Sequence, residues 1–404
     1  MAPSNSTHSP VPTDHSRQSE IPALNGPNNN ARLSLSGERF RATYRLAFAE
    51  NEARSLAQSI AVEQTIEFPL DLVRRGDIRD HIVVRVEDLR RIDDRSFEAV
   101  VSYAVETTGF ELTQLLNVLF GNISLLPGIR LERFDWPSSF DAAFPGPRFG
   151  IAGMRRILSI AERPILATAL KPMGLLPSEL ANLAYELARG GLDVLKEDHG
   201  LADQPFARFQ DRVSRISEAV ARANAETGGR CLYAPNVTAD PWIALERARA
   251  ASEAGAGALL VTPGLAGLPL LHKLSTETEF DLPILAHPAF AGSQVLRSNE
   301  GISPYAYFGL IHRIAGADAV VFPHPGGRFT FSAVDALELQ AGTRAPLGRI
   351  QPILPAPAGG MTLARVPELV SFYGRDVMLL IGGDLYRGAT PGDNARRLRE
   401  SVEP

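Results

Sequence analysis

The stretch LDVLKEDHGLADQPF, residues 192–206, places four ionisable side chains directly after an apolar run. The apolar run fits a buried strand, whereas the residues KEDH (196–199) need charged or hydrogen-bonding partners wherever they are withdrawn from water. Because side chains alternate along a strand, Lys196 and Asp198 should share one face and Glu197 the other, with His199 in the following loop. This ending predicts a functional site at the carboxyl end of the strand.

Short apolar runs alternate with amphipathic helical segments throughout the second half of the chain. The runs are PILATAL (164–170), LDVLK (192–196), CLYAPN (231–236), GALLVTP (257–263), PILAHP (283–288), AVVFPHP (319–325), IQPILPAP (350–357) and DVMLLIGG (376–383). Eight strand-then-helix units in about 250 residues predict a (β/α)8 TIM barrel. An open doubly wound sheet is the alternative, but the count of eight and the lack of GxGxxG in the first unit disfavour it.

The composition divides the chain into three regions. Residues 1–36 are rich in serine, proline, asparagine and threonine and nearly free of large apolar side chains, so we expect a disordered tail. Residues 37–147 hold strand-like runs at 40–48 and 98–105 and helical segments at 51–64 and 110–122, which predict a small α+β domain. The Pro- and Gly-rich segment 144–153 marks the boundary to a barrel domain at 148–404.

Charge and cysteine content exclude several classes of protein. The 404 residues carry a formal net charge of −5 and contain no long basic run, which argues against nucleic acid or an anionic membrane as partner. A single cysteine, Cys231, allows no intramolecular disulfide, and no apolar stretch has the length of a membrane span. The N-terminus also lacks the pattern of a secretory signal, so we expect a cytoplasmic protein.

Polar and glycine residues follow almost every predicted barrel strand, at the end where TIM-barrel active sites lie. They are Lys171 after the first strand, Lys196, Asp198 and His199 after the second, Asn236 after the third, His287 after the fifth, His324 and Arg328 after the sixth, Gly359 and Gly360 after the seventh, and Gly382 and Gly383 after the eighth. Each alone could cap a strand or face solvent. The two glycine pairs fit a phosphate site, because glycine lets backbone N–H groups approach a phosphate closely.

A lysine beside an aspartate is either a plain ion pair or part of a metal site. A cationic lysine would repel the metal. If CO2 adds to the neutral amine of Lys196, the carbamate is anionic and offers the hard oxygen ligands that Mg²⁺ prefers.

Several segments besides the opening stretch form a set. They are AVEQT (61–65), FGN (120–122) followed by GIRLERFDWP, ATALKPMGL (167–175), RGGLD (189–193), LKEDHGLADQPFARFQDRV (195–213), LPAPAGGM (354–361) and LLIGGDL (379–385). This set resembles the RuBisCO large-subunit superfamily, and the resemblance extends from about residue 40 to the end of the chain.

The departures from the family pattern point to one branch of it. His199 stands where the family has a third metal-ligand glutamate, and Arg328 stands where RuBisCO has the mobile-loop lysine that handles CO2. A serine, an arginine and a phosphate-binding histidine are replaced by Ala358, Pro288 and Val321. These losses argue against carboxylation of a bisphosphate, so the chain resembles a form IV RuBisCO-like protein.

The resemblance implies a Mg²⁺ ion held by carbamylated Lys196, Asp198 and position 199. His199 is then either a ligand of a looser or different metal, or a base beside a water that fills the vacancy. Lys171 is implied as an acid or base. His287 is either a proton shuttle or a hydrogen-bonded core histidine.

In the family, residues at the positions of Glu63 and Asn122 reach the barrel of the partner subunit, which implies a homodimer with shared sites. The glycine pairs, His324 and Arg328 are the expected substrate or phosphate contacts.

The implied chemistry is formation of a metal-stabilised enediolate from a phosphorylated sugar or sugar acid. The form of AVEQT and of the metal strand favours a 3-oxo-isoapionate-4-phosphate decarboxylase or transcarboxylase/hydrolase. The alternatives are a 5-methylthioribulose-1-phosphate isomerase or a methylthio-diketone-phosphate enolase. A non-catalytic sugar-phosphate sensor and an aldolase-type barrel with a Schiff-base lysine are alternatives of other classes.

Overall fold

The computed structural model describes residues 33–73, 76–327, 329 and 331–403. The predicted tail therefore lies almost entirely outside the described residues. Within the described part, no helix is long and apolar enough to cross a membrane. The boundaries predicted at residues 36 and 147 remain predictions.

Eight parallel strands form the barrel that the sequence predicts. They are β5 (Ile165–Leu170), β6 (Val194–Glu197), β7 (Leu232–Ala234), β8 (Leu259–Val261), β9 (Ile284–Ala286), β11 (Ala319–Pro323), β12 (Leu354–Ala358) and β13 (Met378–Leu380). The hydrogen-bonded order is β7-β6-β5-β13-β12-β11-β9-β8. A parallel bridge between Asn236 and Leu260 then links the two ends, with the Leu260 amide donating to the Pro235 carbonyl at 2.9 Å. The sheet is closed, which confirms the barrel over the open alternative.

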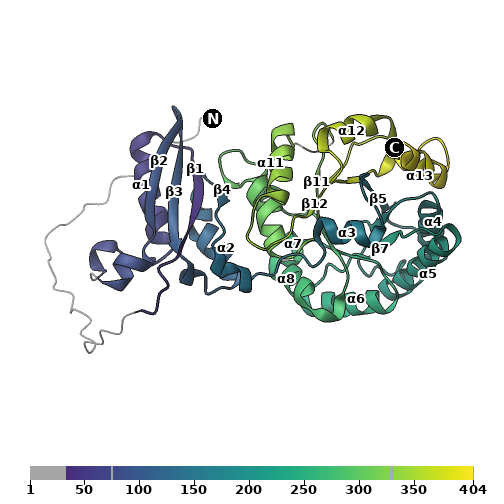
Figure 1. Ribbon diagram of the computed structural model, residues 1–404, viewed down its shortest axis with the longest axis horizontal. Coiled ribbons are helices and arrows are strands. Elements are labelled where there is room, and N and C mark those ends of the chain that lie inside the picture. Colours follow the sequence, from purple (N-terminus) through teal and green to yellow (C-terminus); the bar gives the residue numbers. More distant parts are fainter. Residues whose placement is uncertain (1–32, 74–75, 328, 330, 404) are drawn as a thin grey trace, which may run out of the picture. The chain divides into compact units, whose positions relative to one another are not determined.

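Helices lie outside the strands and alternate with them along the chain (Figure 1). The main ones are α3 (Gly150–Leu158), α4 (Pro177–Arg189), α5 (Phe209–Thr227), α6 (Pro241–Glu253), α8 (Leu268–Thr276), α11 (Ala333–Arg344), α12 (Val366–Tyr373) and α13 (Pro391–Glu400). Short pieces fill the loops: α7 (Pro263–Ala266), α9 (Gly292–Val295), a π-helical turn at Tyr305–Ile311 and α10 (His312–Ile314). Small and branched side chains, such as Ala167, Val194 and Leu260, fill the barrel interior, which is therefore a packed core.

A second sheet has five strands in the order β10-β4-β1-β3-β2. All of them except β10 come before the barrel strands in the sequence. Its strands are β1 (Arg39–Leu46), β2 (Arg85–Asp93), β3 (Ser96–Ala104), β4 (Ile129–Phe134) and β10 (Gly301–Ile302), accompanied by α1 (Glu50–Glu63) and α2 (Leu112–Phe120). β10 comes from the loop after β9 and pairs in parallel with β4. The sequence predicted β1, β3 and both helices but missed β2 and β4.

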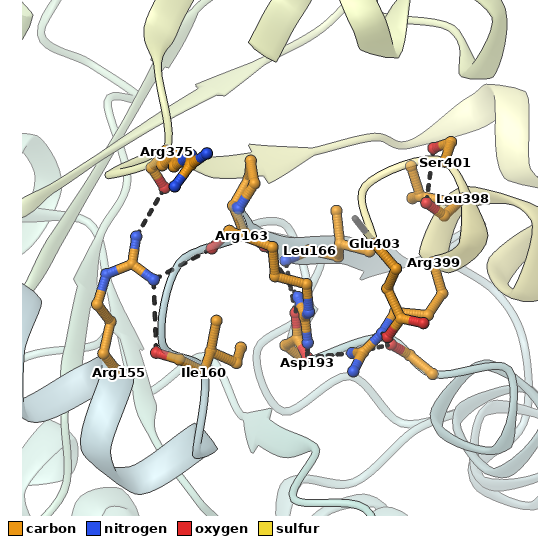
Figure 2. Close-up of polar contacts among 12 residues, drawn as sticks. Arg155, Ile160, Arg163, Leu166, Asp193, Arg375, Leu398, Arg399, Ser401 and Glu403 are labelled. Atoms are coloured by element: carbon orange, nitrogen blue, oxygen red, sulfur yellow. Dashed lines mark hydrogen bonds and ion pairs between the residues drawn. The ribbon is translucent and has the colours of Figure 1, made fainter.

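The amino ends of the barrel strands are held by arginine–carboxylate contacts. Figure 2 shows Asp193, the residue before β6, between Arg163 and Arg399. Arg163 binds both oxygens of Asp193, at 2.6 and 2.7 Å, while the Leu166 amide of β5 donates to the same carboxylate at 2.8 Å. Arg399 belongs to α13, so Asp193 ties the last helix to the first barrel strands. Contacts at this end of a TIM barrel serve stability, whereas chemistry belongs to the opposite end.

Candidate active site

The two faces of β6 carry different chemistry. Val194 packs in the barrel interior, and Lys196 and Asp198 follow it on the same face at intervals of two. Both are buried, at 3% and 8% exposure. Glu197, which is fully buried, lies on the outer face of the strand. The four ionisable residues therefore separate into a pair at the barrel mouth, an acid behind the strand and His199 in the turn beyond it.

Lys171 and Asp198 form an ion pair at the mouth. Lys171 follows β5, the strand beside β6, and its Nζ lies 2.6 Å from Asp198 Oδ2. Burial acts to raise the pKa of Asp198, but the hydrogen bonds from Lys171 and from the Gly200 amide outweigh it and lower that pKa. Asp198 is thus an anion, and Lys171, which is partly open to solvent, is the cation facing whatever enters the mouth.

Lys196 is a buried amine beside this pair. Its Nζ donates to the Glu197 carbonyl at 2.7 Å. Burial lowers the pKa of Lys196 to about 8; the charge of Lys171 acts in the same direction, while Asp198 opposes it. The neutral amine needed for addition of CO2 is therefore accessible near neutral pH.

Two histidines complete the mouth. The rings of His199 and His287 stack with centroids 4.2 Å apart and planes tilted by 13°. Burial, followed by the charge of Lys196, lowers the pKa of His287 far below its ordinary value, so its ring is neutral. Its Nδ1 accepts from the Ala289 amide at 3.2 Å, so the proton lies on Nε2. Sequence reasoning placed His287 here but did not foresee the stacking.

The residue set at the mouth fits a metal ion only with a modified lysine. Among the residues that the structure describes, no three histidine, cysteine, aspartate or glutamate side chains gather in a metal-binding group. Asp198 is the anionic oxygen donor, and its Oδ2 is committed to Lys171. A carbamate on Lys196 would add the missing anionic oxygens, and the lowered pKa of this buried amine suits its formation.

The glycine pairs after β12 and β13 lie next to each other. Ala358 and Leu380 are partners across these strands; Ala358 directly precedes Gly359, and Leu380 lies two residues before Gly382. Gly359 and Gly360 adopt positive φ angles of 84° and 76°, which only glycine takes readily. Around Gly382 and Gly383 an added Cβ would meet no atom within 4 Å, so their backbone faces open space. This arrangement suits a phosphate.

His324 and Arg328 are the other two residues expected near the phosphate. His324 is buried on the outer side of β11, where its Nδ1 lies 2.9 Å from the Tyr373 hydroxyl of α12. Its Nε2 is buried and has no hydrogen-bond partner among the described residues. Arg328 lies outside the described residues, so its predicted role remains a prediction. Val321 is buried in the barrel interior.

Glu63 and Asn122 lie at the same corner of the N-terminal domain. Glu63 is the last residue of α1, and Asn122 begins the short 3₁₀ turn Asn122–Leu125. Buried Gln64 joins the two, because its Nε2 donates to two carbonyls at the end of α2, each at 2.8 Å, and its Oε1 accepts from the Ile123 amide at 3.1 Å. Both Glu63 and Asn122 are exposed, so they are available to a second chain.

Sequence reasoning missed the network behind Glu197. Arg212 of α5 donates to both carboxylate oxygens, from Nε at 2.5 Å and from Nη2 at 3.1 Å. The Tyr233 hydroxyl donates to Glu197 at 2.6 Å, and the backbone amide of Asn236 also donates to Glu197, at 2.9 Å. Each carboxylate oxygen thus has two donors. The alternation of β6 was the available signal, because a buried acid facing the helix layer requires a cation there.

The fold and the mouth define a TIM-barrel enzyme with an N-terminal α+β domain and paired lysines beside an aspartate. Comparison with known proteins agrees. Residues 150–327 match the family model of the ribulose bisphosphate carboxylase large chain, catalytic domain. The chain is 41% identical to ribulose bisphosphate carboxylase-like protein 1 of Rhodopseudomonas palustris, over 86% of this chain and 93% of that protein.

Two further relatives are similar over comparable lengths. The chain is 39% identical to 5-methylthioribulose-1-phosphate isomerase of Rhodospirillum rubrum, over 86% of this chain and 91% of that enzyme. A crystal structure of a RuBisCO-like protein from Rhodopseudomonas palustris superposes with a TM-score of 0.81 at 38% identity, covering 90% of this chain and 97% of that one. This chain belongs to the RuBisCO superfamily, as a RuBisCO-like protein. The comparisons support a non-carboxylating enzyme of that family.

Proposed function

We propose that this protein enolises a phosphorylated ketose, with Lys171 moving the proton, and that its reaction is isomerisation of 5-methylthioribulose 1-phosphate. The observation that carries this proposal is the ion pair of Lys171 and Asp198 at the barrel mouth, 2.6 Å long. The named reaction of the Rhodospirillum rubrum relative supports the choice of substrate.

Lys171 suits proton transfer at a carbon next to a carbonyl. In the ion pair it is protonated and can donate to a developing oxyanion. Lys171 is the residue that would exchange a proton with the substrate carbon, and Asp198 would then hold the metal instead of pairing with Lys171. His287, with its proton on Nε2, can donate a hydrogen bond to a second substrate oxygen.

A divalent metal, which we expect to be Mg²⁺, would supply Lewis-acid polarisation of the substrate carbonyl when bound. Lys196 as a carbamate and Asp198 would hold it, and His199 lies in the third position. Because imidazole is a softer ligand than a carboxylate, His199 favours either a different metal or a role as a base with water in its place.

The substrate would be oriented by one phosphate. The backbone of the two glycine turns after β12 and β13 suits that group. Pro288, Val321 and Ala358, by contrast, provide no charged group for a second phosphate. This asymmetry supports a monophosphate with an apolar far end, as in a methylthio sugar, over a bisphosphate.

The decarboxylase prediction takes second place. Loss of CO2 from 3-oxo-isoapionate 4-phosphate would also leave an enediolate, so the same lysine and phosphate site suit it. The form of AVEQT and of the metal strand favours it, but the relative with a named reaction ranks isomerisation first. The sensor hypothesis conflicts with the retention of Lys171, Lys196 and Asp198 together.

We also propose that the active unit is a homodimer, in which Glu63 and Asn122 complete the mouth of the partner subunit. Their exposure and their common corner support this arrangement.

Proton exchange tests the proposed reaction. The full chain is incubated with bicarbonate and Mg²⁺, mixed with 5-methylthioribulose 1-phosphate in D2O, and followed by proton NMR. We expect deuterium at the carbon next to the carbonyl together with an isomeric product, and neither with the Lys171→Met variant. In parallel, release of CO2 from 3-oxo-isoapionate 4-phosphate tests the second candidate. Tight binding of both compounds without exchange, product or CO2 would refute enolisation and favour the sensor.

A further inference from the structure

One buried side-chain amide, that of Asn236, holds the turn that carries His199. Asn236, at 1% exposure, follows β7, the strand next to β6. Its Nδ2 donates to the carbonyl of His199 at 3.0 Å and to that of Leu201 at 2.8 Å. Two consecutive bonds to the same turn fix the backbone on both sides of Gly200.

The orientation of this amide is itself fixed. The Oδ1 of Asn236 accepts from the Thr238 hydroxyl at 2.6 Å and from the Thr238 amide at 3.2 Å. The Asn236 backbone amide donates to Glu197, which is bound to Arg212. The side chain is therefore held by donors on one side and presents its own two N–H groups to the turn on the other, so it cannot rotate without losing several bonds.

The position of the turn decides where the His199 ring lies. The turn begins at Asp198, whose Oδ1 accepts from the Gly200 amide and lies 3.5 Å from His199 Nδ1. The ring is 43% exposed and rests on His287. The ring is attached to the backbone of this turn, so a shift of residues 198–201 would move it relative to His287.

We propose that Asn236 is a positioning residue for the active site: it holds the turn 198–201 so that the His199 imidazole stays stacked on His287 beside Asp198. This inference rests on the proposed function for its effect on turnover. The positioning itself is independent of that function. Removing a residue that orients an active-site ligand from behind changes activity by about 10- to 100-fold.

The test compares Asn236→Ala with Asn224→Ala. Asn224 of α5 is a matched control, because it also donates to a backbone carbonyl of the β7 region, that of Cys231 at 3.0 Å, but at the opposite end of the strand. Asn236→Ser is a milder second variant in case Asn236→Ala does not fold. The measurements are the crystal structure of each variant, its thermal unfolding, and kcat and KM for 5-methylthioribulose 1-phosphate.

We expect Asn236→Ala to displace the His199 ring from His287 and to lower kcat about 10- to 100-fold, with KM changed less because the glycine turns are untouched. Asn224→Ala should lower only the unfolding temperature. An intact ring stack in Asn236→Ala and Asn236→Ser overturns the inference whatever their rates, and so does a displaced ring with unchanged kcat. If the parent protein has no turnover, the proposed function fails while the ring position still decides the positioning role.

Discussion

Replacing Arg212 by methionine should destabilise the protein strongly, although Arg212 lies behind the active site. The change leaves Glu197, fully buried, without its cationic partner. Breaking a buried ion pair from one side costs about 3–5 kcal/mol, because the remaining charge is desolvated and uncompensated. The carbonyls of Ala202 and Ala207 also lose donors from Arg212, which places the expected cost toward the upper end of that range.

A second arginine–glutamate pair provides the control. Arg249 and Glu279 have nearly the same geometry, with Nε–Oε1 at 2.6 Å and Nη2–Oε2 at 3.2 Å, but both side chains are about half exposed. Because solvent screens such a pair, Arg249→Met should shift the urea midpoint little.

The double variant Glu197→Gln with Arg212→Met should recover about 2 kcal/mol relative to Arg212→Met alone, since no buried charge remains. Urea unfolding followed by circular dichroism measures all three variants. Equal midpoints for Arg212→Met and Arg249→Met would refute the reasoning that burial, and not pairing geometry, sets the cost.

Four further outcomes are expected. Lys171→Met should lower the exchange rate at least about 100-fold, as measured by NMR, and should also lower the unfolding temperature measured by calorimetry, because it leaves buried Asp198 without its ion-pair partner. The carbamate on Lys196, trapped by methylation and detected by mass spectrometry, should increase between pH 7 and pH 9. With a pKa of about 8, the neutral amine rises from about a tenth to about nine-tenths of the total. Asp193→Asn, at the far end of the barrel, should cost about 3 kcal/mol in urea unfolding while leaving kcat unchanged, because it weakens the contacts to Arg163. Gly383→Ala should raise KM for the phosphorylated substrate at an unchanged unfolding temperature, since the added methyl group meets no protein atom and would obstruct only a ligand.

The barrel could be predicted because its strands are buried on both sides and therefore stand out as apolar runs. β2, in contrast, has the sequence RVEDLRRID and is exposed along nearly all its length. Its place in the sheet comes from backbone pairing with β3, which leaves no pattern of alternating burial in the sequence. β4 was missed because IRLERF is short and follows a glycine turn that looks like a loop.

At the active site, strand alternation was enough to place Lys196 and Asp198 together and to separate them from Glu197. The presence of Lys171 at the same rim followed from the common end of neighbouring parallel strands, but its ion pair with Asp198 was not predicted. The same alternation, counted from Val321 inside the barrel, places the His324 side chain on the outer face. This was not predicted, because His324 lies just after the end of β11 and was treated as a loop residue. The bonds of Asn236 and Tyr233 depend on side-chain lengths in three dimensions, which no spacing in the sequence encodes.

The two faces of β6 have different roles: one carries the side chains of the mouth, and the other carries the acid that anchors the strand. This difference affects how such proteins diversify. The acid that secures the strand is directed into the helix layer, so exchanging the groups that project into the mouth leaves the supports of the scaffold intact. The side chain at position 199, in the turn beyond the strand, contributes none of the four hydrogen bonds to Glu197. New reactions in this lineage can arise by altering one side of a single strand.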